Sequence, residues 1–362
     1  MFLPHVAPYG LAPASKREYL VPRLVELVTH HREQCEAYEH VVEDWLDHRA
    51  GEVEQVEDLP FLPVTAFKEY DLRSGATAVS VRSSSTTGQQ PSRIHMDKIT
   101  RTRATLSARA ILSDFIGEHK RPYLVFDAEE TVRGPALTAR AAAVLSLAHF
   151  AEAFHFVMRA DGDALVLDEA VLIRALDTIG DTPFVAYGFT YLLHQAHLDI
   201  LARGAGRAVH PESVLLHSGG WKRLAHLAVD KTSFNRTVAS AWSLADRQVI
   251  DFYGLVEQVG IPYPDCEAGL KHVPYWADVV MRRADTLEPA GPGEVGLIQL
   301  VNCLPLGSPN HSVLTEDLGE LVLEDGCSCG RRGRAFIFRG RAPRAEMRGC
   351  SDVMGASGAR VA

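Results

Sequence analysis

Five consecutive hydroxyl side chains, ended by a glycine, form the stretch of this 362-residue chain with the clearest chemical potential. The stretch consists of Ser83, Ser84, Ser85, Thr86, Thr87 and Gly88. Ser and Thr side chains compete for backbone hydrogen bonds, and glycine adopts conformations closed to other residues, so a loop is predicted. Residues 76–81 alternate apolar and polar side chains, which predicts a strand leading into it. Backbone N–H groups and hydroxyls there can converge on the oxygens of a polyphosphate, although a solvent-exposed linker has the same composition.

Four further polar segments that contain glycine are predicted to follow strands, at long separations along the chain. They are residues 218–222, 249–258, 315–320 and 338–341. In open α/β sheets, ligands bind at the carboxyl ends of the strands, so these turns can converge on one crevice. The adjacent glycines Gly219 and Gly220 would allow the backbone to approach a flat ligand closely. One such turn is weak evidence for a binding site, whereas five in this order are strong evidence.

Helix and strand patterns alternate along the first two thirds of the chain. Helical patterns cover residues 15–50, 100–115, 136–150, 169–179 and 189–202, and strand patterns cover residues 122–126, 164–167, 184–188 and 213–217. Beyond residue 251 the sequence changes to short strands with Gly and Pro, such as 296–302 and 320–323. This order predicts α/β layers with an added sheet or small barrel. The length predicts one large bilobed domain or two domains.

Composition argues against several classes of protein. The net charge of −9 and the absence of a Lys/Arg-rich block argue against a nucleic-acid partner. The longest apolar segment, residues 141–150, is too short to span a bilayer, and the N-terminus lacks the pattern of a signal peptide. Six cysteines in a chain of this length do not indicate a disulfide scaffold. A cytoplasmic protein without a membrane span is therefore expected.

These motifs in this order resemble the adenylate-forming superfamily, which includes acyl-CoA synthetases and luciferases. Within it, the chain is most similar to the LuxE-type acyl-protein synthetases of bacterial bioluminescence fatty-acid reductase, with phenylacetate-CoA ligases as more distant relatives. The segments that carry the resemblance are residues 61–68, 83–88, 219–222, 253–258, 315–319, 340–341 and 348–351. The resemblance covers about residues 20–352. It implies a large N-terminal adenylation domain of layered α/β subdomains with a small β-rich part, over residues 1–338. Residues 339–362 would then be a C-terminal domain truncated to a hinge and short tail.

The resemblance also implies roles in ATP binding. Residues 83–88 would hold the β- and γ-phosphates, while Gly219 and Gly220 would pack against adenine through their backbone. Tyr253 would stack on or flank the base, and Asp317 would bind the ribose hydroxyls.

Further roles concern the metal and the charges of the reaction. The motif that begins with Tyr253 and Gly254 ends with Glu257, which would help to hold Mg²⁺. Arg341 matches the arginine near the superfamily's hinge. Lys222 is a candidate cation for the α-phosphate or the substrate carboxylate.

The reaction implied is attack of a carboxylate, expected to be that of a fatty acid, on the α-phosphate of ATP. Charge accumulates on phosphate oxygens, where Mg²⁺, Lys222 and backbone donors would stabilise it. Cys350 is the candidate thiol that would then take the acyl group, because three nearby arginines (Arg341, Arg344 and Arg348) would lower its pKa and enrich the thiolate. In LuxE-type enzymes a cysteine near the C-terminus accepts the acyl group before a reductase partner does.

Two other functions stay open at this stage. An adenylating ligase could pass the acyl group directly to CoA, to the thiol of a carrier protein or to an amine. A degenerate nucleotide-binding scaffold is the third reading, because Ser85 stands where the superfamily commonly has glycine and a later lysine is missing.

Two cysteine-containing pairs suggest a structural zinc site. Cys327 and Cys329 are separated by one residue, and Cys266 and His272 lie upstream. Three thiols and an imidazole form a tetrahedral zinc set, although two unrelated buried pairs would have the same sequence. The remaining histidines are expected to be ordinary surface or core residues, and Lys68 a solvated helix residue.

Overall fold

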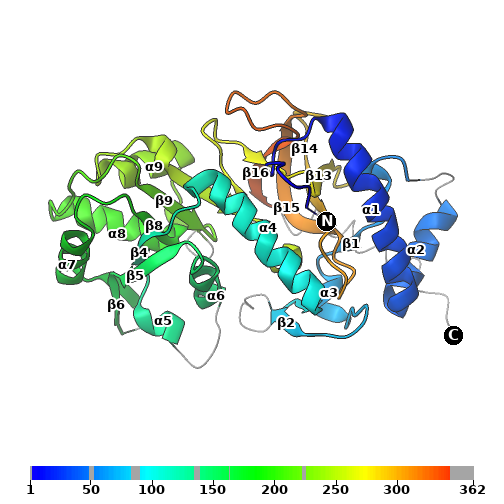
Figure 1. The fold of residues 1–362 in the computed structure, drawn as a ribbon, viewed down its shortest axis with the longest axis horizontal. Helices are drawn as coiled ribbons and strands as arrows, with labels where there is room; N and C mark the ends of the chain where they lie inside the picture. Colours follow the sequence, from blue (N-terminus) through cyan, green and yellow to red (C-terminus); the bar gives the residue numbers. More distant parts are fainter. Residues whose placement is uncertain are drawn as a thin grey trace. The chain divides into compact units, whose positions relative to one another are not determined.

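The computed structural model describes residues 2–48, 53–82, 90–133, 139–162, 164–221 and 226–342. These residues form two compact units (Figure 1). Unit 1 contains the described residues of Met1–Ile111, Gly254–Tyr263 and Ala268–Ala362, and unit 2 contains those of Leu112–Tyr253 and Pro264–Glu267. The proposed domain boundary after residue 338 falls inside a strand, β16 (Ala335–Arg341). The assignment of residues 339–362 to a separate tail therefore stays a prediction.

Unit 2 is built on a parallel sheet with the strand order β10-β9-β8-β4-β5. The strands are β4 (Arg121–Phe126), β5 (Ala151–Phe156), β8 (Val185–Phe189), β9 (Val214–Ser218) and β10 (Val249–Tyr253). Their side chains alternate between the two faces of the sheet, as the period of two requires. In β4, Leu124 and Phe126 join one apolar cluster and Tyr123 and Val125 join the other. Both faces are therefore buried, which explains the continuous apolar runs of these strands.

Helices cover both faces of this sheet. Residues of α7 (Glu169–Ile179), α8 (Thr190–Ala202) and α9 (Lys231–Ser240) pack in one cluster. Residues of α6 (Ala139–Ser146) and of the end of α4 (Lys98–Ile116) pack in the other. The smaller elements of unit 2 are α5 (Glu129–Arg133), β6 (Met158–Asp161), β7 (Ala164–Leu167) and η3 (Asp246–Gln248).

Unit 1 is built on an antiparallel sheet with the strand order β12-β16-β15-β14-β13. The strands are β12 (Lys271–His272), β13 (Ala277–Arg282), β14 (Val295–Asn302), β15 (Ser312–Leu323) and β16, and β1 (Leu62–Pro63) pairs parallel with β15. A separate hairpin consists of β2 (Val79–Arg82) and β3 (Arg93–Met96). The short β11 (Tyr263–Pro264) straddles the sequence boundary between the units.

The helices of unit 1 come mainly from the N-terminal part of the chain. They are α1 (Pro13–Gln34), α2 (Glu36–His48), α3 (Ala66–Glu69) and the single turns η1 (Val56–Asp58) and η4 (Val256–Gln258). α1 has Pro13 in its first turn, where the missing N–H costs nothing, and buries Leu20, Leu24 and Leu27 at helical spacing. Within the part of the chain that the structure describes, no helix has the length and apolar character to cross a bilayer.

Most predicted elements are present, and two of the predicted turns are wrong. The helix predicted over residues 169–179 is α7, and the strand predicted over 213–217 is β9, shifted by one residue. Residues 315–320 lie inside β15, however, and residues 338–341 lie inside β16, so neither segment is a turn after a strand. Polar residues and glycine in these segments suggested turns, but antiparallel pairing with neighbouring strands keeps them extended.

Candidate functional site

The predicted site residues divide between the two units and a set outside the described residues. Residues 83–88, Lys222 and Cys350 belong to that last set, so their roles stay predictions. The structure describes only the strands that flank the hydroxyl run, β2 and β3, which pair with Arg82 opposite Arg93. Unit 2 contributes Gly219, Gly220 and Tyr253, and unit 1 contributes Gly254, Glu257, Asp317 and Arg341.

The double glycine of unit 2 forms the turn that ends β9. Gly219 and Gly220 both have positive φ, 81° and 57°, a region that favours glycine. A Cβ on Gly219 would lie 2.4 Å from Cδ1 of Phe189, whereas a Cβ on Gly220 would meet nothing within 4 Å. The sequence therefore needs glycine at both positions for conformation, and at Gly219 also for space. The result is a turn at the carboxyl end of β9 with an exposed backbone. A ligand that binds through main-chain contacts requires such a turn.

A histidine that the sequence interpretation treated as ordinary lies beside this turn. His217 of β9 pairs in register with Asp251 of β10, and its Nδ1 lies 3.6 Å from the Asp251 carboxylate. Its Nδ1 is also 3.0 Å from the Thr190 hydroxyl, which donates to the carbonyl oxygen of Ser218 at 3.0 Å. Because the hydroxyl has one proton and gives it to a carbonyl, Nδ1 of His217 must carry the proton that it donates to Thr190. The strand ends therefore hold a histidine of defined tautomer beside the Gly219 turn.

Tyr253 is the last residue of β10. It is buried at the last position of the strand, and the following Gly254 is exposed. One residue earlier, Phe252 stacks on Tyr187, with ring centroids 6.4 Å apart. Burial raises the pKa of Tyr187 to about 12, so its hydroxyl, 3.3 Å from that of Ser218, stays protonated at neutral pH. Aromatic rings thus fix the end of β10 within unit 2.

Asp317 and Arg341 of unit 1 face each other across the β15–β16 pair. Their Cα atoms are register partners, and Nε of Arg341 lies 3.6 Å from Oδ1 of Asp317. The Asp317 side chain is 9% exposed and the Arg341 side chain 77% exposed, so the carboxylate is held while the guanidinium reaches solvent. The Thr315 hydroxyl accepts from the Asp317 N–H at 3.1 Å and donates to the carbonyl oxygen of Ile298 at 2.8 Å. The Asp317 carboxylate is therefore held in place on β15, whereas the long Arg341 side chain beside it extends into solvent.

Glu257, the predicted Mg²⁺ ligand, is a buried carboxyl group of unit 1. Burial raises its pKa above the ordinary value, and the nearby Asp317 raises it further. A hydrogen bond from Ser92 and the charge of Lys68 act in the opposite direction. Lys68 is half-buried in α3, so it acts on the candidate site rather than being only the solvated helix residue that was expected. Two carboxylates and one ammonium group of this unit are thus electrostatically coupled.

A network of side-chain amides holds the turn that presents Glu257. Nδ2 of Asn310 donates to the carbonyl oxygen of Glu257 at 2.7 Å, and Nε2 of Gln258 donates to the carbonyl oxygen of Asn310 at 3.0 Å. Nδ2 of Asn302 donates to Oε1 of Gln258 at 2.8 Å. Because buried amides are costly when unpaired, this network fixes the backbone of η4.

The predicted zinc ligands come together in the structure. Cys266, His272, Cys327 and Cys329 place one ligand atom each so that all four lie within 4.8 Å of one another. Three of the four residues are buried and Cys329 is partly exposed. The alternative of two unrelated pairs is therefore wrong as to position, although position alone does not assign a metal.

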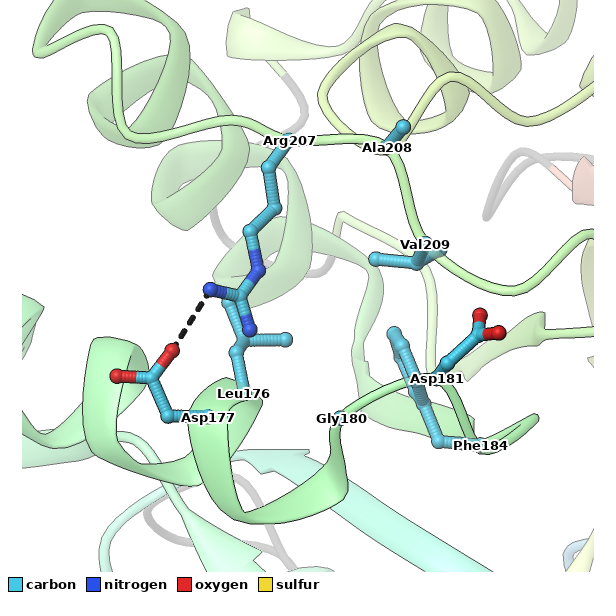
Figure 2. A pocket seen from close by; sticks show the side chains of 8 residues that line it. All are labelled: Leu176, Asp177, Gly180, Asp181, Phe184, Arg207, Ala208 and Val209. Atoms are coloured by element: carbon cyan, nitrogen blue, oxygen red, sulfur yellow. Dashed lines mark hydrogen bonds and ion pairs between the residues drawn. The ribbon is translucent and has the colours of Figure 1, made fainter.

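An open pocket of unit 2 contains none of the predicted site residues (Figure 2). Its volume is about 460 Å³, and it is lined by Leu176, Asp177, Gly180, Asp181, Phe184, Arg207, Ala208 and Val209. Arg207 pairs with Asp177 across it at 2.9 Å, with 40% and 64% of the two side chains exposed. A solvated ion pair that satisfies both its charges gives no reason to place the reaction there.

Sequence reasoning missed His217, Asp251, Thr190, Ser92 and Lys68 as neighbours of the site residues. Asp251 was part of a recognised motif, but its contact with His217 follows from the register of two strands that are more than thirty residues apart. The α/β pattern predicts parallel strands, whose carboxyl ends lie at one edge of the sheet. A search for polar side chains at the ends of neighbouring strands would therefore have found His217 and Asp251. Nothing in the sequence around Lys68 or Ser92 indicates Glu257 as their neighbour.

Comparisons with known proteins agree with the expected family. Residues 6–357 match the model of a family described as acyl-protein synthetase, LuxE. A curated relative, the long-chain-fatty-acid–luciferin-component ligase of Aliivibrio fischeri, is 30% identical over 134 residues. That match covers 36% of this chain and 34% of the relative, so it spans about a third of the relative's length.

Solved structures show the same fold at low identity. An open conformation of 2-hydroxyisobutyryl-CoA ligase, in complex with 2-HIB-AMP and CoA, matches with a TM-score of 0.66 and 13% identity, over 94% of this chain and 80% of that one. The thioesterification state of the same ligase matches with a TM-score of 0.65 and 16% identity, over 94% and 72%. The expected α/β fold of adenylate-forming ligases is thereby confirmed. Because its family model matches nearly the whole length, this chain belongs to the LuxE acyl-protein synthetase family.

Proposed function

We propose that this chain activates a fatty acid with ATP and transfers the acyl group to a protein thiol, first its own Cys350. The carboxylate oxygen attacks the α-phosphorus of ATP, the bond to the β-phosphate oxygen breaks, and acyl-adenylate and pyrophosphate form. A thiolate then attacks the acyl carbonyl carbon, and AMP leaves as the carbon–oxygen bond breaks. A cytoplasmic reductase or carrier protein would receive the acyl group from Cys350.

The observation that carries this proposal is the family match over residues 6–357. It is supported by polar groups at the positions where the superfamily resemblance places nucleotide contacts. In unit 1, Asp317 is a fixed carboxylate suited to two ribose hydroxyls, because each of its oxygens accepts hydrogen bonds. In unit 2, the Gly219–Gly220 turn leaves exposed backbone for a flat base.

The donor set of unit 1 fits a magnesium ion bound with ATP. Mg²⁺ prefers carboxylate oxygens together with substrate phosphates and water. Glu257 is a carboxyl group whose burial raises its pKa, so a cation that replaces its proton would remove the cost of the buried charge. Bound Mg²⁺ would neutralise phosphate charge and act as a Lewis acid. Lys222 and Arg341 would contribute positive charge to the nucleotide, with the hydroxyl run at residues 83–88 holding its phosphates.

Acid-dependent pyrophosphate release and mass spectrometry of the intact protein test this function together. We expect ATP and a series of fatty acids to give pyrophosphate release and an acyl adduct on Cys350. The variant Cys350→Ser should retain acid-dependent exchange of pyrophosphate into ATP while losing the adduct. No exchange with any acid, while ATP still binds, would contradict the adenylation step and favour a nucleotide-binding scaffold.

Direct transfer to CoA is a second candidate function. Its support is the fold likeness to a ligase whose structures contain an acyl-adenylate analogue and CoA. An acceptor screen with CoA, carrier proteins and amines separates the two candidates. Product formation that survives Cys350→Ala favours direct transfer, whereas product formation that requires Cys350 favours the acyl-enzyme.

A further inference from the structure

Four metal-ligating side chains lie close together away from the residues assigned to ATP. The ligand atoms of Cys266, His272, Cys327 and Cys329 all lie within 4.8 Å of one another, and Sγ of Cys329 is 3.3 Å from Nε2 of His272. His272, Cys327 and Cys329 belong to unit 1, and Cys266 is on the four-residue stretch 264–267 that is bonded to unit 1 at both ends. The four ligands thus come from two short segments of the sequence, residues 266–272 and 327–329.

The ligand types and spacings suit zinc. Zn²⁺ in structural sites takes four Cys and His ligands in a tetrahedron, at about 2.3 Å for sulfur and about 2.0–2.1 Å for nitrogen. Those bond lengths place neighbouring ligand atoms roughly 3.5–3.8 Å apart. The observed separations need to change by only about 1 Å to meet this geometry. In the part of the chain that the structure describes, Cys266, Cys327 and Cys329 are not in disulfides.

We propose that these four side chains bind one structural Zn²⁺ ion. Binding displaces a proton from each of the three thiols, and His272 binds as a neutral imidazole through Nε2. Four protein ligands leave no open coordination position, so the ion has no place for water or substrate and is structural rather than catalytic.

The site would fix one end of the strand pair that carries Asp317 and Arg341 at its other end. Cys327 and Cys329 lie in the connection between β15 and β16, and His272 of β12 pairs with Ala335 of β16. Within the connection, the Gly330 N–H donates to the carbonyl oxygen of Cys327 at 3.0 Å, and the Gly333 N–H donates to Oδ1 of Asp325 at 2.9 Å. A metal would join this connection to the 266–272 segment and so anchor the hairpin.

Metal analysis of the purified full-length chain is the first test. We expect about one equivalent of zinc per chain, bound without any substrate, and release of that zinc when a mercurial reagent has modified three thiols. After zinc removal and denaturation, all six cysteines of the sequence should react as free thiols. Zinc below a tenth of an equivalent, in protein purified and refolded with added Zn²⁺, would overturn the proposal. A disulfide within the cluster would also overturn it.

Variants with a matched control separate metal binding from folding. Cys327→Ser should lose most of the bound zinc and lower the Tm, whereas Cys303→Ser should retain the full equivalent. Cys303 is an appropriate control because it is also buried, lies outside the cluster, and burial raises its pKa to about 12. If Cys327→Ser does not fold, replacement of Zn²⁺ by Co²⁺ in the wild-type chain gives an independent result. The absorption spectrum of tetrahedral, thiolate-bound Co²⁺ supports the site, and an octahedral spectrum contradicts it. These readouts do not depend on ligase activity, so failure of the proposed function would leave them unchanged.

Discussion

The two units differ in the kind of group that their predicted nucleotide-binding residues present. Unit 2 presents main chain at the ends of parallel strands, where Gly219 and Gly220 adopt positive φ. Unit 1 presents charged side chains, with Asp317 fixed on an antiparallel strand and Glu257 held by a network of amides. Backbone contacts depend on conformation and space, whereas charged contacts depend on partners and pKa. We therefore expect added side-chain volume to damage unit 2 and altered charge to damage unit 1.

Substitution of Gly219 by alanine should have the largest effect. The left-handed conformation costs a non-glycine residue about 1–2 kcal/mol, and the contact of the new Cβ with Phe189 adds roughly 1–3 kcal/mol of overpacking. Gly219→Ala should therefore lower the free energy of unfolding by about 2–5 kcal/mol in total. Urea denaturation of unit 2, followed by Trp fluorescence, measures the loss.

Gly220→Ala is the matched control for this prediction. Its φ of 57° is equally left-handed, but a Cβ there meets nothing within 4 Å, so only the conformational cost of about 1–2 kcal/mol applies. Equal losses in the two variants would show that the contact with Phe189 does not restrict position 219.

Removal of one charge at Asp317 should reduce activity more than stability. Hydrogen bonds to a charged group are worth roughly 1.5–3 kcal/mol, so Asp317→Asn should lower kcat/KM for ATP by about tenfold to a hundredfold. The carboxylate lies on a strand paired on both sides, so the fold should persist. The measurement is acid-dependent pyrophosphate exchange as a function of ATP concentration.

Glu320→Gln controls for a general effect on the same hairpin. Glu320 pairs with the partly exposed Arg339, with Nε of the arginine 3.0 Å from the carboxylate, and such a pair contributes about 1 kcal/mol or less. We expect unchanged kcat/KM for ATP in this variant. A similar loss in Glu320→Gln and Asp317→Asn would mean that hairpin charge in general, not the carboxylate of Asp317, supports activity.

Acid should destabilise unit 1 more steeply than unit 2. Burial lowers the pKa of His31 to about 2 and of His311 to about 3 in unit 1. In unit 2 it lowers the pKa of His197 to about 4 and moves that of His194 in the same direction, so unit 1 has two large shifts and unit 2 has one. The groups around the first two histidines, His30, Tyr38 and Ser74, bring no carboxylate that could offset their protonation.

The folded-state pKa values of these histidines lie below the unfolded value near 6.5, so the unfolded chain binds more protons as pH falls. Each histidine then costs about 1.4 kcal/mol per pH unit between pH 6.5 and its folded pKa. Hydrogen exchange at pH 7.5 and pH 5, corrected for intrinsic rates, should show protection falling further in β15 than in β8. Equal losses in the two strands would contradict the difference between the units.

The sequence revealed the parts of the fold that follow from local pattern, such as α7 and the buried parallel strands. It missed α9, a short helix of which only Phe234, Val238 and Ala239 are buried. It read residues 315–320 as a turn because the segment contains Asp and Gly, which are depleted in strands. The motif order led to the prediction of Glu257 and Asp317 as site residues, which stays a prediction. The charge that Lys68 exerts on Glu257 depends on tertiary contact between segments far apart in sequence.

Lys68→Met tests that coupling and should have the smallest effect. The ammonium group lowers the pKa of Glu257, so its removal should raise that pKa further above the ordinary value. Our proposal that the Glu257 carboxylate holds Mg²⁺ predicts that adenylation falls as pH drops through the pKa of Glu257. The acid limb of the pH–rate profile should therefore move to higher pH in this variant. We expect the rate on the plateau of the profile to change little. Lys98→Met, at an exposed position that begins α4, should leave the profile in place. An unshifted acid limb in Lys68→Met would show that Lys68 does not influence the ionisation of Glu257. The proposed importance of charge in unit 1, in contrast to the backbone turn of unit 2, would then rest on Asp317 alone.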